Sequence, residues 1–264
     1  MRAIASRPSR QARTVCPPSR QSVRRLRTLP ARWPVCVSGT ADPVAGSVGW
    51  SSTRPRYPTR RTAPLFEILT VCTGNICRSP LAEHLLRARL APYSPLVASA
   101  GTRGLASAPM TDEAVRLAVD LGVPAEVAAT HRSRFLLDAM LSQPDLILTM
   151  TRDHRREVAE LAPARLRSTF TIREFARIAS TMSDDELQTA AADGGMDAAA
   201  RVRAMGLGVA ARRGLTMPPT SPDQDDVIDP YGRSWQTYQL SASQLAPAIG
   251  HVVRAVSLAV APAG

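Results

Sequence analysis

The sequence predicts an α/β fold for residues 65–264: a single domain with a mostly parallel four-stranded sheet flanked by helices. Residues 65–71 form a short apolar run containing Ile, Thr and Val, which is typical of a buried strand. Beyond it, strand and helix patterns alternate, which favours parallel strands covered on both faces. The turn after the first strand contains Gly and Asn and leads into a helix, as a phosphate-binding loop does.

Residues 1–64 differ sharply in composition from the rest of the chain. They contain 9 of the 22 prolines, 13 of the 33 basic residues and one of the 22 acidic residues. This composition predicts a disordered Arg/Pro-rich arm, or a start assigned upstream of the native one. An export signal at Arg24-Arg25 or a transit peptide is less favoured, because arginines and prolines interrupt the segment that follows.

The rest of the chain is electrically balanced, with 20 basic and 21 acidic side chains. This balance gives no electrostatic case for a nucleic-acid partner. No apolar run approaches the ~20 residues of a membrane helix, so no membrane partner is expected. Four cysteines in 264 residues are too few for a disulfide scaffold. They include no Cys-x2-Cys pair, so no zinc site is expected. A reducing cytoplasm is the expected location.

The predicted elements follow one another closely from residue 65. Ser79 is expected to cap the first helix, with Pro80 at its first position and Glu83 in its first turn. The other expected elements are strands at 96–99 and 145–150 and helices at 112–121, 134–141, 152–161, 173–178, 196–212 and 235–260.

A reactive cysteine is predicted where the first strand meets the first helix, in the segment Cys72-Thr-Gly-Asn-Ile-Cys-Arg-Ser79. Open α/β sheets bind ligands at the carboxyl ends of their strands, which is where Cys72 lies. The free N–H groups and the dipole of the following helix suit a phosphate. Gly74 and Asn75 tolerate the left-handed backbone that a ring of inward N–H groups requires.

These residue types suit phosphoryl transfer. A helix N-terminus and Arg78 favour the thiolate form of Cys72, which is a nucleophile toward a phosphate monoester. Arg78 offers a planar fork for two phosphate oxygens. Ser79 can donate a hydrogen bond to the thiolate or assist its departure from a phosphocysteine. The competing interpretation is a buried, inert cysteine in a strand–helix turn.

The ten residues 71–80 match the signature loop of the low-molecular-weight protein tyrosine phosphatase family along its whole length, and residues 65 to about 258 resemble that family. The segments 99–102, 131–133 and 145–150 are also similar to family segments. The resemblance implies an enzyme that hydrolyses phosphotyrosine in proteins through a phosphocysteine on Cys72, without a metal or cofactor. Its expected partner is a phosphotyrosine protein, with a bacterial tyrosine kinase as one candidate.

The resemblance also implies roles for individual residues. Asp229, followed by Pro230, is expected to be the general acid and base, with the neighbouring acids 223, 225 and 226 as rival candidates. Tyr231 is expected to stack on a phenyl phosphate. Ser99 and His131 are expected to support the loop through a buried polar network with Asn75. The expected phosphate-binding residues are Thr73, Gly74, Asn75, Ile76, Cys77 and Ser79.

Cys77 has two interpretations. A sulfenic acid formed on Cys72 by peroxide could condense with a nearby thiol, and the family resemblance supports this protective role for Cys77. The alternative is that Cys77 only fills space at the start of the helix.

Three alternative functions are distinguished by single features. Protein phosphoarginine phosphatases of this family carry Thr where this chain has Ile76. Thioredoxin-coupled arsenate reductases need further cysteines, and none follows Cys77. A non-catalytic phosphate-binding module is disfavoured because Cys72, Arg78, Ser79 and Asp229 are all present.

Two features depart from the family pattern. Residues from about 164 to 222 are longer than the corresponding stretch of compact members and are predicted to be a helical insertion. Leu105 stands where eukaryotic members place an aromatic residue that lines the substrate pocket.

Overall fold

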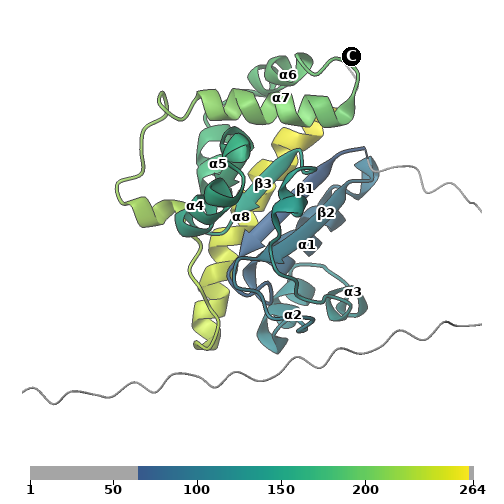
Figure 1. Cartoon of the computed structure of the whole chain (residues 1–264), viewed down its shortest axis with the longest axis vertical. Helices are drawn as coiled ribbons and strands as arrows, with labels where there is room; N and C mark the ends of the chain where they lie inside the picture. Colours follow the sequence, from purple (N-terminus) through teal and green to yellow (C-terminus); the bar gives the residue numbers. More distant parts are fainter. Residues whose placement is uncertain (1–64, 262–264) are drawn as a thin grey trace, which may run out of the picture. The chain divides into compact units, whose positions relative to one another are not determined.

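The computed structural model describes residues 65–261, so the predicted arm at 1–64 lies outside the described residues. Four parallel strands form one sheet in the order β2-β1-β3-β4 (Figure 1). These strands are β1 (Glu67–Cys72), β2 (Leu96–Gly101), β3 (Leu146–Thr149) and β4 (Thr169–Thr171). Because every strand pair is parallel, all four carboxyl ends lie at the same edge of the sheet, as predicted for the ligand-binding edge.

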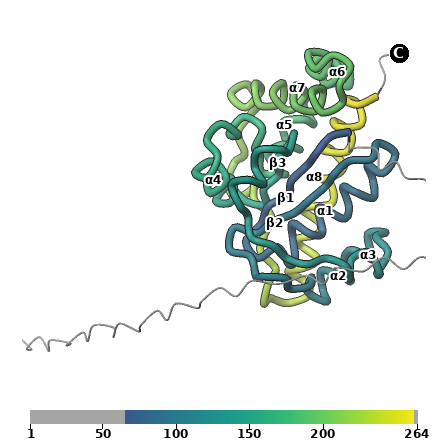
Figure 2. Tube along the Cα trace, turned by 45° about the vertical axis from the view of Figure 1, so that its right-hand side comes forward, coloured from purple at the N-terminus to yellow at the C-terminus, as the bar shows by residue number. Residues whose placement is uncertain are grey.

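Successive side chains of β1 enter two separate cores, as the period of a strand requires. Ile68 belongs to a large cluster with side chains of α1 (Arg78–Arg89) and α8 (Trp235–Val260). Leu69 and Val71 belong to a smaller cluster with Val158 of α4 (Arg152–Leu161). The sheet is therefore covered on both faces, and Figure 2 shows α1 and α8 side by side along it.

Five further α-helices and four short 3-10 turns complete the described part of the chain. The helices are α2 (Asp112–Asp120), α3 (Ala125–Ala129), α5 (Ile172–Ala179), α6 (Asp184–Ala192) and α7 (Ala198–Ala211). The 3-10 turns span Ala91–Tyr93, Asp138–Leu141, Pro163–Ser168 and Pro222–Asp225. Within the described residues, no helix is both long and apolar enough to cross a bilayer.

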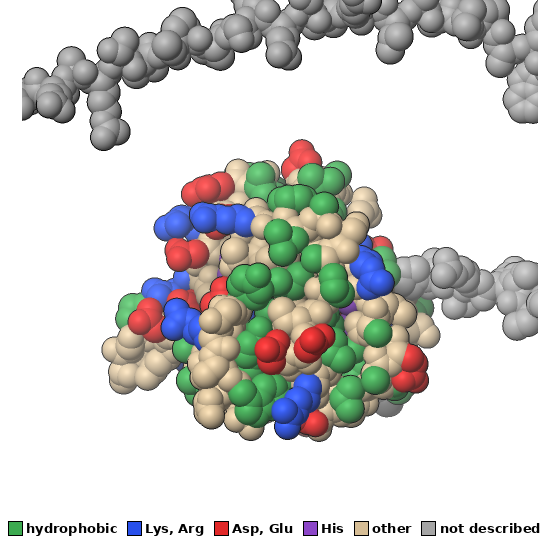
Figure 3. Space-filling view, turned by 90° about the horizontal axis from the view of Figure 1, so that it is seen from below, with side chains coloured by type: hydrophobic (Ala, Val, Ile, Leu, Met, Phe, Trp, Pro, Cys, Tyr) green, Lys and Arg blue, Asp and Glu red, His purple; other side chains and the backbone are tan. Residues whose placement is uncertain are grey.

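The face seen from below in Figure 3 carries charges of both signs. Arginine side chains are separated there by acidic and hydrophobic ones and do not form a continuous basic patch on the part of the chain drawn in colour. The visible charge distribution on this face agrees with the balanced composition of residues 65–264.

Two local predictions are wrong. The helix predicted at 134–141 is extended at its start, because Gly101 N–H donates to the Arg134 carbonyl and Leu136 N–H to the Gly101 carbonyl, which aligns the backbone with the end of β2. Only a 3-10 turn at Asp138–Leu141 remains. Ser79 does not cap α1, which begins at Arg78 with Cys77 at the cap position.

The stretch predicted to be a helical insertion, residues 164–222, contains a strand as well as helices. The three residues of β4 pair with β3 and are all buried. Thr171 and Glu174 then form a reciprocal capping box that begins α5. The helices α6 and α7 follow and pack closely on each other.

Candidate active site

The loop after β1 folds around the sulfur of Cys72. The Asn75 backbone N–H donates to Cys72 Sγ over 3.2 Å, and the Ser79 hydroxyl lies 2.9 Å from the same sulfur. Asn75 adopts a φ of 54°, the left-handed conformation predicted for this turn. Gly74, which could also tolerate this conformation, does not adopt a positive φ. The left-handed conformation of Asn75 accompanies the hydrogen bond from its N–H to the sulfur.

Asn75 links the loop to neighbouring segments through its buried side chain. Its Nδ2 donates to Ser79 Oγ over 2.9 Å and to Ser99 Oγ over 2.8 Å, and its Oδ1 accepts from the Arg134 N–H over 3.0 Å. Ser79 Oγ accepts this bond, and its own hydrogen has two acceptors within reach, Cys72 Sγ at 2.9 Å and the Ala100 carbonyl at 3.4 Å. The network predicted for Asn75 and Ser99 is therefore present.

His131 and Glu83 extend this network behind the loop. His131 Nε2 donates to the Asn75 carbonyl over 2.8 Å, while the Ser99 hydroxyl donates to Glu83. Burial lowers the pKa of His131. Glu83, expected in the first turn of the helix, is only 4% exposed and is also paired with Arg87. Sequence reasoning missed its place in the site, because only the packing of α1 against β2 shows it.

The guanidinium of Arg78 is buried and held from three sides. Nη1 donates to the Val227 carbonyl over 3.0 Å, and Nη2 donates to Thr73 Oγ1 over 3.3 Å. Nη2 also lies 2.7 Å from Oδ2 of Asp229. Nε is buried and has no hydrogen-bond partner among the described residues. A buried, unpaired N–H on a permanent cation is suited to an anionic ligand.

Asp229 and Tyr231 lie on the loop that leads into α8. The Asp229 side chain is 48% exposed, and its Oδ1 accepts from the Tyr231 N–H over 3.3 Å. The rival acids are engaged elsewhere: Asp223 and Asp226 pair with Arg152 at 2.8 and 3.0 Å, and Asp225 pairs with Arg177 at 2.8 Å. Of these four carboxylates, Asp229 is the one paired with Arg78.

One cavity of about 230 Å³ brings most of the predicted site residues together. Its lining includes Leu105, the residue that stands where eukaryotic members of the similar family place an aromatic side chain. Gly101 borders the loop closely, because a Cβ at that position would lie 2.6 Å from the Thr73 carbonyl oxygen. Lining the cavity are Cys72, Thr73, Gly74, Ile76, Cys77, Arg78, Arg103, Leu105, Asp229 and Tyr231.

Cys77 is a free thiol at the start of α1, as Cys72 is at the end of β1. Its sulfur lies 3.5 Å from Thr111 Oγ1 and 3.6 Å from the hydroxyl of Tyr238 in α8. Burial raises the pKa of Cys77. In this arrangement its hydrogen bonds go to α8 and to the cap of α2.

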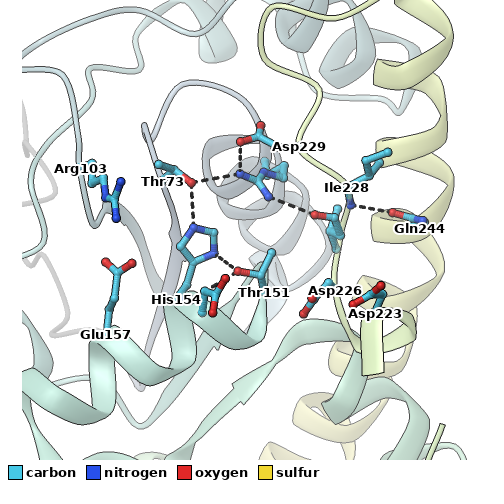
Figure 4. Close-up of a pocket in the computed structure, with 13 residues that line it drawn as sticks. Thr73, Arg103, Thr151, His154, Glu157, Asp223, Asp226, Ile228, Asp229 and Gln244 are labelled. Carbon is cyan, nitrogen blue, oxygen red and sulfur yellow. Dashed lines mark hydrogen bonds and ion pairs between the residues drawn. The ribbon is translucent and has the colours of Figure 1, made fainter. Parts of the chain in front are cut away.

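A second cavity, of about 550 Å³, adjoins the first and shares Arg78 and Asp229 with it. Figure 4 shows His154 beneath Thr73, with its Nε2 2.9 Å from Thr73 Oγ1. Its other ring nitrogen lies 2.8 Å from Thr151 Oγ1. Burial, followed by the charge of Arg78, lowers the pKa of His154 to about 4. Sequence reasoning did not identify His154 because it stands 81 residues from its partner Thr73.

The family model described as "Low molecular weight phosphotyrosine protein phosphatase" matches residues 67–185. The probable low molecular weight protein-tyrosine-phosphatase EpsP of Ralstonia nicotianae is 38% identical over 108 residues, which cover 41% of this chain and 71% of EpsP. The chain belongs to the low molecular weight protein-tyrosine-phosphatase family.

Other relatives and solved structures match to different extents. Low molecular weight protein-tyrosine-phosphatase Etp of Escherichia coli K12 is 45% identical over 96 residues, 36% of this chain and 62% of Etp, so the match spans less than two thirds of that relative. A protein-arginine-phosphatase of Bacillus subtilis is 31% identical over 109 residues, 41% of this chain and 71% of that protein. The crystal structure of a low molecular weight protein tyrosine phosphatase from T. tengcongensis aligns at 25% identity with a TM-score of 0.50, over 71% of this chain and 97% of that one.

Proposed function

We propose that this protein hydrolyses phosphotyrosine in proteins through a phosphocysteine intermediate on Cys72. One observation carries the proposal: the thiol of Cys72, the guanidinium of Arg78 and the carboxylate of Asp229 line a single cavity of about 230 Å³. Together they supply a nucleophile, a phosphate ligand and a proton donor, the three groups that hydrolysis of a phosphate monoester through a covalent intermediate requires.

In the first step the Cys72 thiolate attacks phosphorus. The S–P bond forms and the P–O bond to the tyrosyl oxygen breaks, while protonated Asp229 gives its proton to the leaving phenolate. Arg78 offers Nε and Nη2 to two oxygens of the transferred group. The Asp229 carboxylate, now 2.7 Å from Nη2, gives up this contact as the phosphate enters.

In the second step water attacks the phosphocysteine. Asp229 accepts a proton from the water, the new P–O bond forms and the S–P bond breaks. The returning thiolate is stabilised by the Asn75 N–H at 3.2 Å and the Ser79 hydroxyl at 2.9 Å. We assign Asn75, Ser99 and His131 the task of holding the loop in this shape, since their hydrogen bonds join it to β2 and to residue 134.

The lining of the cavity favours an aromatic leaving group. Ile76, Leu105 and Tyr231 contribute apolar surface to the same cavity as Cys72. We expect Tyr231, which is 60% exposed and lines this cavity, to stack on a phenyl ring that enters from solvent. Phosphoarginine is the second candidate substrate, because one relative is named a protein-arginine-phosphatase.

We also propose a protective role for Cys77, a cytoplasmic location and no membrane partner. Both site cysteines are free thiols, the form in which peroxide chemistry can begin. The partner we expect is a phosphotyrosine protein, with a bacterial tyrosine kinase as one candidate.

The direct test is a substrate comparison with the full-length chain in the presence of EDTA. Phosphotyrosine, phosphoarginine and phosphoserine peptides are compared at equal concentration, and Cys72→Ser serves as the inactive control. We expect kcat/KM to be highest for phosphotyrosine and turnover to be lost in the variant. Preference for phosphoarginine would select the second candidate, and turnover by Cys72→Ser would exclude the phosphocysteine route.

A further inference from the structure

A buried histidine outside the phosphate loop contacts it through a single side chain. His154, in the first turn of α4, is 4% exposed and lies between two threonines. Its Nε2 is 2.9 Å from Thr73 Oγ1, and its Nδ1 is 2.8 Å from Thr151 Oγ1. Figure 4 shows these bonds continuing from Thr73 to the guanidinium that pairs with Asp229.

Arg78, Thr73, His154 and Thr151 form one hydrogen-bonded chain. An arginine can only donate, so Thr73 Oγ1 accepts from Arg78 Nη2 at 3.3 Å. The Thr73 hydroxyl keeps one hydrogen, which it can donate to an unprotonated His154 Nε2 at 2.9 Å. In that tautomer the ring hydrogen is on Nδ1 and is donated to Thr151 Oγ1.

This direction requires a neutral imidazole, and its surroundings keep it neutral. Burial and the charge of Arg78 lower the pKa of His154 to about 4. The acids that oppose this effect, Asp229, Asp153 and Asp226, contribute less than burial and Arg78 do. At neutral pH the ring is thus neutral, which leaves one ring nitrogen able to accept a hydrogen bond, and we assign that nitrogen as Nε2.

The bond matters because Arg78 has few other constraints once a phosphate displaces Asp229. Nη1 stays bound to the Val227 carbonyl at 3.0 Å, and Nε is without a partner among the described residues. A second fixed point is needed to set the plane of a guanidinium, and Thr73 Oγ1 supplies it. With no acceptor at position 154, the Thr73 hydroxyl is free to rotate and its hydrogen can point at Arg78.

We infer that His154 is a positioning residue for the phosphate site, which acts through the Thr73 hydroxyl to set the plane of the Arg78 guanidinium. The inference rests on the proposed function for its place in the reaction. The same positioning role predicts that inorganic phosphate binds more weakly when the contact between His154 and Thr73 is removed. Phosphate affinity can be measured without turnover.

The test compares the full-length chain with four variants. His154→Leu removes the acceptor at position 154, His154→Gln keeps an acceptor there, and Thr73→Val removes the hydroxyl. The fourth is the double variant His154→Leu/Thr73→Val. For each, kcat/KM on a phosphotyrosine peptide is measured. The Kd for inorganic phosphate is measured by calorimetry in a Cys72→Ser background. His84→Leu is the matched control, since His84 is also buried, at 3% exposed, and donates to no residue of the loop among those described.

We expect His154→Leu and Thr73→Val each to lower kcat/KM and phosphate affinity about 10-fold, the size of one hydrogen bond to a charged group. The double variant should lose no more than either single variant, because both break the same chain. In His154→Gln, both kcat/KM and phosphate affinity should be close to the values of the parent. In His84→Leu, neither quantity should change appreciably.

Three results would overturn the inference. One is an unchanged phosphate Kd in His154→Leu, and another is a double variant whose loss is the product of the single losses. The third, which applies even if His154→Leu does not fold, is Thr73→Val binding phosphate as tightly as the parent does. If no variant or parent turns over phosphotyrosine but the phosphate affinities follow the expected pattern, the proposed function fails and the positioning role stands.

Discussion

The carboxylate of Asp229 forms an ion pair with Arg78, with Oδ2 2.7 Å from Nη2. The residue proposed to donate the proton thus occupies the guanidinium that is proposed to bind phosphate. Arg78 is 3% exposed, whereas half of the Asp229 side chain faces solvent. The aspartate is therefore the partner that moves when an anion enters.

The first prediction follows from this competition. Asp229→Asn removes a negative charge beside the anion site, so inorganic phosphate should bind several-fold more tightly than to the parent at pH 7. Calorimetry in the Cys72→Ser background measures this directly. Weaker binding in Asp229→Asn would mean that the carboxylate helps to organise Arg78 for phosphate.

Asp229→Ala should lower kcat by about 10²- to 10⁴-fold for a phosphotyrosine peptide, because the phenolate must leave without a proton. An aryl phosphate whose phenolate is a much better leaving group should lose far less. Steady-state assays on both substrates check this. An equal loss on the two would assign the proton transfer to another group, with Asp226 the next to test.

Arg78→Lys should be nearly inactive although the charge is kept. A lysine has one ammonium group and cannot contact the Val227 carbonyl, Thr73 Oγ1 and two phosphate oxygens at once. Turnover of a phosphotyrosine peptide and circular dichroism of the folded variant are the measurements. A kcat/KM close to that of the parent would show that charge alone suffices.

The free energy of unfolding should fall as the pH drops below about 6.5, because burial lowers the pKa of histidines in the folded state. The pKa of His154 is lowered from 6.5 to about 4, so between these values the unfolded chain binds a proton that the folded chain does not. The resulting decrease in the free energy of unfolding due to His154 reaches roughly 3 kcal/mol by pH 4. Burial lowers the pKa values of His84 and His131 as well, which adds to the loss.

Urea unfolding of the parent and of His154→Gln from pH 7.5 to 4 isolates the part that His154 contributes. The variant should show a shallower decline over this range. Parallel curves for the two proteins would place the His154 pKa near its ordinary value.

Mild peroxide should inactivate the enzyme reversibly through a Cys72–Cys77 disulfide. The Cys77 sulfur must first leave Thr111 and Tyr238, at 3.5 and 3.6 Å, and turn toward Cys72. Mass spectrometry detects the bridge, and thiol treatment should restore activity. In Cys77→Ser, Cys72 should be over-oxidised irreversibly; full recovery of that variant by thiol would leave Cys77 with a packing role.

The centre of the site could be predicted from local sequence patterns, because its parts are contiguous. Cys72, Asn75 and Arg78 lie within one strand–loop–helix segment, whose local pattern specifies the backbone that places them together. The bounds of α4 and α8 were predicted correctly for a similar reason, since apolar spacing and the residues that flank each helix are local signals.

Only the tertiary structure decided the features that join distant segments. β4 is three residues long and has too little pattern of its own, so its pairing with β3 was needed to reveal it. Residues 134–136 have a helical pattern but lie extended, because hydrogen bonds to Gly101 outweigh local propensity. Glu83 and His154 reach the site by packing, 16 and 81 residues from Ser99 and Thr73. Sequence patterns report the preferences of neighbouring residues, whereas these contacts depend on how whole elements pack, which no local pattern encodes.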